Sequence, residues 1–388
     1  MFENVATVPA DPILSLLDSY RSDRRADKLD LGVGIYRNEQ GLCPILQCVK
    51  IAEMRLVEEQ QTKAYLGPEG NAPFLDGLSA VIFGPHQPAK ERCIGMQTPG
   101  GTGALRLASE LLAMAGSAAT VLVGVPSWTN HIPILQAAGL RTREYPYLRS
   151  HGQELHWSEI LAALHCGRPG DVVLLQGCCH NPSGVDLNEQ QWQELTEVIV
   201  SRGLIPFLDI AYHGFGESLE QDAKGVRHLF SRVEEALFAY SCSKNFGLYR
   251  DRVGALFILA RNRRERERLE GQVSRLARAN WSMPPDHGAA VVSLIWGSDA
   301  LTAQWLQELG EMRARIAEIR CTLAQTNQKI SFLSQQKGLF SQVPLSANGG
   351  AWLRSRGIYV PDSGRLNLAG LMSRDIDRLA RALGECLP

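Results

Sequence analysis

The sequence predicts an α/β fold with a largely parallel sheet. Short apolar runs alternate with longer stretches of helical character along the 388 residues, as expected for parallel strands joined by crossover helices. Several of the apolar runs lead into polar or glycine-containing loops, which is where open α/β sheets usually place their ligands. An amphipathic stretch near the carboxyl end adds a long helix of the kind that can join two lobes.

The predicted strands are the most apolar short runs of the chain. The clearest are Thr120–Val125, Val172–Leu175, Leu204–Leu208, Leu237–Tyr240 and Ala255–Leu259, with a shorter candidate at Ile358–Val360. Each of the first four ends in a polar or glycine-containing loop. We therefore expect these loops to contribute side chains to one functional site.

The long helix is predicted over Leu301–Leu323. Apolar residues recur there at steps of three or four: Leu301, Trp305, Leu309, Met312, Ile316, Ile319 and Leu323. One face of this helix is therefore apolar, and its length suits a spine between two lobes. The preceding charge run Asn262–Arg268 has balanced signs, which favours a solvated helical face over a nucleic-acid patch.

The composition excludes several classes of protein. With 40 basic and 41 acidic side chains, the chain has no overall attraction to nucleic acid or to an anionic membrane. No uncharged apolar run approaches the ~18 residues of a membrane span, and the N-terminus lacks the pattern of a secretory signal. The nine cysteines follow no paired framework, so we expect a reducing, cytoplasmic setting.

A glycine-rich turn lies at Thr98–Leu105 (TPGGTGAL), before a predicted helix over Ala104–Met114. Such a turn can present free N–H groups and the positive end of the helix dipole to an anion. The segment is neither a P-loop nor a G-x-G-x-x-G motif. By itself it fits a structural turn as well as a phosphate site.

Lys244, in the segment SCSKNF, follows the predicted strand Leu237–Tyr240 directly. Burial there would lower the pKa of its amine and make it nucleophilic toward a carbonyl group. Arg252, eight residues further on, could join a phosphate cradle. Two other interpretations remain open: a solvated loop lysine, and the S-x-x-K motif of penicillin-recognising enzymes, whose partner tripeptides are absent.

Two further strand ends carry polar side chains. Asp209 closes the apolar run LIPFL, where a carboxylate needs a paired cation or a ligand, and Tyr212 could face the same site. After another strand, the turn residues of GCCHNPSG would fix Asn181 in place. The adjacent residues 178–180 (CCH) cannot readily converge on one ion, and no further metal motif occurs, so we expect no metal.

Together, the predicted strand ends offer an anion cradle, a carboxylate, a phenol, an amide and a lysine. This combination suits pyridoxal 5'-phosphate (PLP). The lysine would form a Schiff base with the aldehyde, the carboxylate would keep the pyridine nitrogen protonated, and N–H groups with an arginine would hold the phosphate.

Four segments resemble the motifs of the class I aspartate/aromatic amino-acid aminotransferases, which are PLP enzymes of fold type I. They are PGGTGALR, GCCHNPSG, FLDIAYHGF and SCSKNFGLYRDRVGAL, in the family's order. The resemblance extends along the chain from the segment MFENV to the segment SGRLNLAGL. Among the members of the family, the motifs look most similar to those of bacterial aromatic amino-acid aminotransferases. It implies a large domain, with a mostly parallel seven-stranded sheet flanked by helices, and a smaller α+β domain. The implied boundaries are 1–12 for an N-terminal arm that clasps the partner, 45–314 for the large PLP-binding domain with part of the connecting helix, and 13–44 with 315–388 for the small domain.

The resemblance also implies roles for the residues around the cofactor. Lys244 matches the Schiff-base lysine, which also moves a proton between the substrate Cα and the cofactor. Asp209 matches the partner of the pyridine nitrogen, and His131 is similar to the histidine behind it. The other matched positions are Asn181 and Tyr212 at the 3'-oxygen, Trp128 over the ring, Gly101, Thr102, Ser241, Ser243 and Arg252 at the phosphate, and Tyr65 as a phosphate contact donated by the neighbouring subunit.

For the substrate, Arg365 resembles the arginine that grips the α-carboxylate with a two-pronged ion pair, next to Asn181 and Trp128. Arg278 resembles the arginine that reaches from the partner subunit to the distal carboxylate of a dicarboxylic substrate. Gly34 resembles a glycine of the segment that closes over the substrate. The family is a homodimer with active sites at the subunit interface, and its partners are amino acids and 2-oxo acids.

Some positions depart from the aspartate-preferring members of the family. Cys43, Ala64 and Met283 are less polar than the residues usual at these positions, which should favour a substrate with an aromatic ring. Arg37 does not distinguish an aromatic preference from an aspartate preference. Gln176 in place of a common histidine is expected to be a mild change. The segment 342–356 (QVPLSANGGAWLRSR) fits the family poorly, and its glycine pair puts closure of the small domain in question.

The resemblance implies an aminotransferase that moves the α-amino group between phenylalanine, tyrosine, aspartate or glutamate and 2-oxoglutarate by a ping-pong reaction. The alternatives are a strict aspartate:2-oxoglutarate enzyme, a specialised biosynthetic aminotransferase, another PLP reaction such as β-elimination or decarboxylation, and a non-enzymatic regulator on the same fold.

Overall fold

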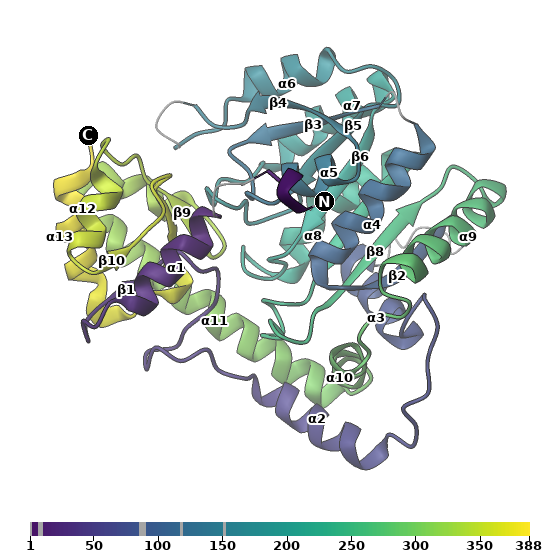
Figure 1. Cartoon of the computed structure of the whole chain (residues 1–388), viewed down its shortest axis with the longest axis horizontal. Coiled ribbons are helices and arrows are strands. Elements are labelled where there is room, and N and C mark those ends of the chain that lie inside the picture. The colour runs from purple at the N-terminus through teal and green to yellow at the C-terminus, as the bar shows by residue number, and fades with distance from the viewer. Residues whose placement is uncertain (1, 7–10, 85–90, 117–118, 150–152) are drawn as a thin grey trace.

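The computed structural model describes residues 2–6, 11–84, 91–116, 119–149 and 153–388 (Figure 1). Its centre is a seven-stranded sheet. In order across the sheet the strands are β2 (Cys93–Pro99), β8 (Val253–Leu259), β7 (Ala236–Ser241), β6 (Ile205–Ile210), β5 (Val172–Gln176), β3 (Thr120–Val125) and β4 (Arg141–Pro146). Only β8 runs antiparallel to its neighbours, so the predicted α/β fold with a mostly parallel sheet is confirmed.

The five long strand predictions are confirmed to within two residues at each end, and two strands of the sheet were missed. The missed strands, β2 and β4, form the two edges of the sheet. Strand β4 exposes charged side chains such as Arg141 and Glu144, and β2 contains Gly95 and Gln97. Neither strand therefore stands out as an apolar run, which is the pattern that marks a strand buried on both faces.

Helices cover both faces of the sheet (Figure 1). One face packs against α4 (Gly100–Ala115), α5 (His131–Ala137) and α9 (Arg263–Asn280). The opposite face packs against α3 (Ala72–Phe83), α6 (Trp157–His165), α7 (Glu189–Arg202), α8 (Leu219–Arg232) and α10 (His287–Trp296). Neighbouring strand residues such as Phe207 and Leu208 belong to opposite hydrophobic clusters, because successive side chains of a strand point to opposite faces.

The long helix predicted over Leu301–Leu323 is confirmed as α11 (Asp299–Thr326). In Figure 1 it runs from the region of α10 and α2 (Gln47–Glu59) to the lobe that contains the C-terminus. Its buried residues up to Ile316 belong to the cluster of the large sheet, whereas Ile319 and Leu323 belong to a separate cluster. The apolar face of a single helix thus contributes to two cores.

Both ends of the chain build this separate cluster. Strand β1 (Leu29–Asp30) pairs in parallel with β10 (Ile358–Tyr359), which matches the short strand predicted at Ile358–Val360. Strand β9 (Phe340–Gln342) pairs antiparallel with β11 (Arg365–Asn367). The surrounding elements are α1 (Pro12–Ser22), α12 (Gly349–Ser355), α13 (Ile376–Cys386) and the 3-10 segments η3 (Gln328–Gln335), η4 (Leu368–Gly370) and η5 (Ser373–Asp375).

The glycine pair of the atypical segment 342–356 lies in helix α12 and has a steric reason. A Cβ atom on Gly350 would lie 2.0 Å from Oδ1 of Asp362, and one on Gly349 would lie 3.0 Å from Cβ of Leu345 and 3.2 Å from Cβ of Cys386. The two glycines therefore allow α12 to pack closely against the turn before β11 and against the end of α13.

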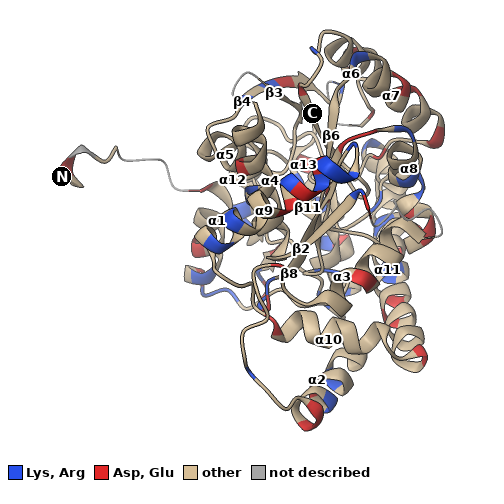
Figure 2. Cartoon of the chain, turned by 90° about the vertical axis from the view of Figure 1, so that its right-hand side faces the viewer, with Lys and Arg blue, Asp and Glu red and all other residues tan. Residues whose placement is uncertain are grey.

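Basic and acidic residues are interspersed along the ribbon in the view of Figure 2, in keeping with a formal net charge of -1. None of the helices that the structure describes is long and apolar enough to cross a membrane. Of the predicted N-terminal arm, residues 1 and 7–10 lie outside the described residues. Phe2 and Val5, within the described part, are largely exposed.

Candidate active site

A cavity of about 200 Å³ lies at the carboxyl ends of the central strands and the N-terminus of α4. It is lined by Gly34, Gly101, Thr102, Leu105, Trp128, Gln176, Asn181, Asp209, Ala211, Tyr212, Ser241, Ser243, Lys244, Tyr249 and Arg252. The structure thus brings together all the predicted site residues except Tyr65, Arg278 and Arg365. A larger cavity of about 420 Å³ lies between the 177–189 loop and α8. Its lining includes Glu217 and Lys337, which form an ion pair with each other, and it contains none of the predicted site residues.

Lys244 lies in the turn that follows β7, and its amine faces the ring of Tyr212, with Nζ 4.9 Å from the ring centroid. Burial lowers the pKa of this amine to about 8; Arg252 lowers it too, whereas Asp209 raises it. The turn is fixed by the next residue, Asn245, whose carbonyl oxygen accepts a 2.8 Å hydrogen bond from the indole of Trp305 in α11. A substantial share of the amine is therefore neutral, and so nucleophilic, near pH 8.

Asp209 forms the start of a buried hydrogen-bond chain. Its Oδ2 lies 2.7 Å from Nε2 of His131, and Nδ1 of His131 lies 2.7 Å from Oγ of Ser127. Since an ionised carboxylate only accepts hydrogen bonds, Nε2 of His131 is the donor to Asp209. This arrangement fixes the orientation of the imidazole, and the imidazole in turn holds the carboxylate at the cavity.

Gln176, which ends β5, holds the loop that carries Asn181. Its Oε1 accepts from the backbone N–H of Asn181 at 2.8 Å, and its Nε2 donates to the backbone carbonyl of the same residue at 2.9 Å. The Asn181 side chain then donates to the Tyr212 hydroxyl at 3.2 Å. The position of Gln176 at the end of a predicted strand is the only sign of this role in the sequence.

At one end of the cavity, the N-terminus of α4 lies close to the positively charged Arg252. Among the residues that the structure describes, no side chain caps the N-terminus of α4, so its first N–H groups remain available to a ligand. Arg252 donates to the hydroxyl of Ser243 at 3.3 Å and to the carbonyl of Tyr249 at 3.2 Å. Gly100 has a φ of 71°, and a Cβ atom on it would lie only 2.5 Å from Nη2 of Arg252, so a glycine is needed there.

Arg365 lies outside the lining of the cavity but reaches its edge from β11. Its Nη1 donates to the Asn181 side chain at 3.4 Å, and its Nη2 donates to the Gly32 carbonyl at 2.5 Å. The residue is only 5% exposed, burial lowers the pKa of its guanidinium, and no carboxylate pairs with it within the part of the chain that the structure describes. A buried arginine without an acid partner is suited to receive a ligand carboxylate.

Gly34 belongs to the 32–36 segment that lies against this arginine. A Cβ atom on Gly34 would lie 2.6 Å from Cζ of Phe340, and the Phe340 ring also packs 4.5 Å from the Arg365 guanidinium carbon. The absence of a side chain thus lets the segment lie close to the ring.

Tyr65 and Arg278 lie away from the cavity. Tyr65 is 90% exposed, and Arg278 is exposed in the last turn of α9. The residue after Tyr65 approaches Met283, because the Leu66 N–H lies 3.1 Å from the Met283 sulfur. Within one chain neither predicted residue reaches the cavity, as expected if both act on a neighbouring subunit.

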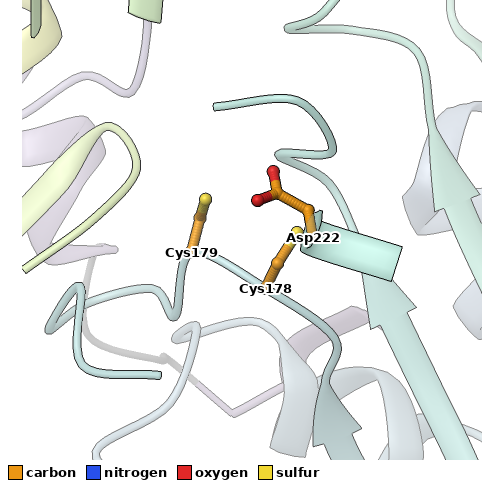
Figure 3. Close-up of side chains that lie close together, drawn as sticks. All are labelled: Cys178, Cys179 and Asp222. Carbon is orange, nitrogen blue, oxygen red and sulfur yellow. The ribbon is translucent and has the colours of Figure 1, made fainter. Parts of the chain in front are cut away.

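Cys178 and Cys179, which are buried, lie close to Asp222, which is half-buried (Figure 3). The possible ligand atoms lie within 4.8 Å of one another. A hydrogen bond to Cys179 lowers the pKa of Cys178, but burial and nearby acids raise it to about 11; burial raises that of Cys179 well above its usual value. The Asp222 carboxylate accepts hydrogen bonds from the backbone N–H groups of residues 214, 216 and 217 at 2.8–3.0 Å. Protonated thiols and an occupied carboxylate are poor metal ligands.

The groups at the cavity fit PLP. The helix start with Ser243 and Arg252 can hold a phosphate, Lys244 can react with the aldehyde, and Asp209 can face the ring nitrogen. Trp128 also lines the cavity and packs edge-on against His131, with ring centroids 5.3 Å apart.

Comparisons with known proteins agree with this chemistry. Residues 26–383 match the model of a family described as aminotransferase class I and II. An aromatic-amino-acid aminotransferase of Pseudomonas aeruginosa is 46% identical over 99% of this chain and 98% of its own length. An aspartate aminotransferase of Escherichia coli is 42% identical over 99% of both chains.

Solved structures give the same result. The crystal structure of an aromatic-amino-acid aminotransferase from Burkholderia pseudomallei, covalently bound to pyridoxal phosphate, is 40% identical, with a TM-score of 0.96 over 100% of both chains. The structure of an aromatic amino acid aminotransferase with 3-indolebutyric acid is 38% identical, with a TM-score of 0.95 over 99% of both chains.

The lowered pKa of Lys244 predicts a pH-dependent reactivity of the apoprotein. Because the amine reacts when neutral, competitive labelling of Lys244 by a trace of acetic anhydride should be half-maximal near pH 8. Peptide mass spectrometry gives the labelling of Lys244 and of the exposed Lys50 in the same sample. A profile for Lys244 that coincides with that of Lys50 would contradict the assigned environment.

Substitution of Gly100 by alanine should weaken cofactor binding. The added Cβ would displace Arg252 and strain a backbone with positive φ, so we expect the Kd for PLP to rise at least about tenfold, or about 1.4 kcal/mol. Titration of the apoprotein measures this change. Gly271→Ala in α9, where a Cβ meets nothing within 4 Å, is the matched control and should bind normally. An unchanged Kd in Gly100→Ala would show that the close approach to Arg252 is not needed.

Proposed function

Because the chain belongs to the class I and II aminotransferases, we propose that it transfers the α-amino group between an aromatic or dicarboxylic amino acid and 2-oxoglutarate on PLP. The aromatic donors are phenylalanine and tyrosine, and the dicarboxylic ones are aspartate and glutamate. The reaction is ping-pong, since one cofactor receives the amino group from the donor and later passes it to the acceptor.

One arrangement carries the proposal: Lys244, with its lowered pKa, lines the same cavity as the Ser243 and Arg252 cradle and as Asn181, to which Arg365 donates. A substrate whose carboxylate pairs with Arg365 would place its Cα near the Lys244 amine. The two ends of the site therefore suit an α-amino acid bound to a phosphate-bearing cofactor.

PLP, when bound, supplies an electron-accepting ring and an aldehyde that condenses with amines. The chain's own groups then control protons and orientation. Lys244, partly neutral near pH 8, would accept the proton from the substrate Cα and carry it to the next site of protonation. Asp209, held by His131, would pair with the protonated ring nitrogen and so favour the electron-accepting form of the ring.

The aromatic preference is proposed from three weakly polar positions. Cys43 and Ala64 are exposed and Met283 is half-buried in a single chain, and none of them lines the 200 Å³ cavity. They would contribute to the substrate pocket only where a second subunit covers it. Relatives named aromatic-amino-acid, tyrosine and aspartate aminotransferase all span this chain, which supports a dual range of substrates.

A homodimer with shared active sites is part of the proposal. In this arrangement Tyr65 contacts the phosphate, and Arg278 the distal carboxylate, in the partner's site. The exposed apolar side chains of α2 and its flanking segments support it, since an interface would remove them from water. They are Leu42, Ile45, Met54, Val57, Tyr65 and Leu66.

The domain division remains a proposal: arm 1–12, large domain 45–314, and small domain 13–44 with 315–388. The separate hydrophobic cluster built from both chain ends supports it. A cytoplasmic location is also proposed, and the nine free cysteines support it, because unpaired thiols persist in reducing compartments.

Arg278→Leu tests both the substrate range and the partner contact. We expect kcat/KM for aspartate to fall about 100-fold, because a charge-assisted pair is lost, while that for phenylalanine changes less than about threefold. Arg275→Leu, at an exposed arginine one turn earlier on α9, is the control and should leave both values unchanged.

Steady-state rates with 2-oxoglutarate as the acceptor give these values. Equal losses on both donors would contradict the role of Arg278. If the unmodified enzyme turns over aspartate but not phenylalanine, the enzyme is the strict aspartate:2-oxoglutarate alternative.

A further inference from the structure

A small cavity lies apart from the candidate active site, between the carboxyl-terminal half of α11, the end of η3 and the loop after β6. Its volume is about 60 Å³, and it shares no lining residue with the 200 Å³ cavity. The polar part of its lining includes Arg313, Arg320, Ser334, Gln336 and Lys337. We refer to it as the Arg320 cavity.

The lining of the Arg320 cavity is positively charged. It contains two arginines and one lysine but no aspartate or glutamate. Lys337 is paired with Glu217 at 2.5 Å. Arg313 donates to the carbonyl oxygen of Gly214 at 2.8 Å and has no ion-pair partner among the residues described.

Arg320 is the buried cation of this cavity, with 4% exposure. Burial lowers its pKa to about 10, so the guanidinium remains charged at neutral pH. Its hydrogen bonds go to uncharged groups: the Gly338 carbonyl at 2.6 Å, and the Phe340 carbonyl and the Ser341 hydroxyl at 3.4 Å. No carboxylate lies within 4.0 Å of it in the described part of the chain. Asp186 raises the pKa of Arg320 without forming an ion pair with it. A buried charge without a paired counter-charge is costly, which makes a bound counter-ion favourable.

Gln336 provides a second, independent indication of a ligand. This side chain is 5% exposed, yet neither its Nε2 nor its Oε1 has a hydrogen-bond partner among the described residues. An unpaired buried amide costs roughly 1–3 kcal/mol, so such groups normally bind something. The Nε2 donor suits an anion, and the Oε1 acceptor is left for a water molecule.

We infer that the Arg320 cavity binds a small inorganic anion, such as a halide or phosphate, between Arg320 and Gln336. A water molecule needs roughly 10–15 Å³ of such space, so 60 Å³ admits a single small ion with its water but not an amino acid or a nucleotide. The positive lining and the unpaired amide donor select a negative charge. Neutral water alone would leave the Arg320 charge uncompensated.

The anion would brace a segment that borders the active site. Arg320 holds the backbone at Gly338 and Phe340, and the Phe340 ring packs against Gly34 and Arg365. The backbone N–H of Lys337 also donates to the Gly184 carbonyl at 2.8 Å, close in sequence to Asn181. An ion in the cavity therefore supports the start of β9 on one side and the Asn181 loop on the other.

Crystals of the PLP-bound enzyme grown with sodium bromide test the location directly. We expect an anomalous bromide peak between Arg320 and Gln336 in the unmodified enzyme and in Gln335→Leu, which changes the exposed neighbour. The peak should be absent from Gln336→Leu. Parallel crystals are grown with sodium phosphate. If the cavity of the unmodified enzyme contains nothing but water density in both the bromide and the phosphate crystals, the inference is wrong.

Thermal unfolding of the PLP-bound enzyme tests the same inference in solution. Replacing sodium gluconate, whose anion is too large for the cavity, by bromide or phosphate at constant ionic strength should raise Tm by a degree or more in the unmodified enzyme and in Gln335→Leu. Gln336→Glu places a carboxylate beside Arg320, so it should raise Tm in gluconate and abolish the anion-dependent rise. The same anion-dependent rise in Gln336→Glu as in the unmodified enzyme would refute the site.

Discussion

The amine of Lys244 is buried at the end of β7, where a charge is poorly solvated, and the rest of the site depends on that burial. Its pKa falls to about 8, so the side chain can serve both as a nucleophile and as a proton carrier close to neutral pH. The nearby charges act on it in opposite directions, since Asp209 raises this pKa and Arg252 lowers it. Both are fixed by their own contacts, Asp209 by His131 and Arg252 by Ser243. The parallel sheet brings these groups together because its strands end at one edge.

The substrate side of the site is built by segments from both ends of the chain, around Gly34 and around Phe340 and Arg365. Arg365 extends from β11 to Asn181, and the Phe340 ring lies between this arginine and Gly34. Helix α11 joins the two parts: Trp305 fixes the turn of Lys244, and Arg320, further along the same helix, holds the backbone of β9. A change in the packing of α11 should therefore affect both the cofactor end and the substrate end of the cavity.

The sequence predicts the features that depend on local pattern. Buried strands and the apolar face of α11 produce runs and periodicities that can be read directly, and Lys244 and Asp209 stand at strand ends. Edge strands β2 and β4 lack such runs and were missed. Arg365 and Arg278 lie in ordinary stretches, so only the family resemblance singles them out. The hydrogen bonds of Gln176, and the meeting of Arg320 with Gln336, depend on tertiary packing that a sequence pattern does not record.

The central claim, that Lys244 and Arg365 flank a site for amino-group transfer, is tested most directly by a single half-reaction. The PLP-bound enzyme is mixed with phenylalanine or aspartate without any 2-oxo acid acceptor, and the absorption spectrum and the products are followed. We predict one equivalent of the matching 2-oxo acid per active site, conversion of the cofactor to pyridoxamine phosphate, and no further turnover until 2-oxoglutarate is added. Continuous release of ammonia or CO2 without an acceptor, or no spectral change with any α-amino acid, would contradict the account.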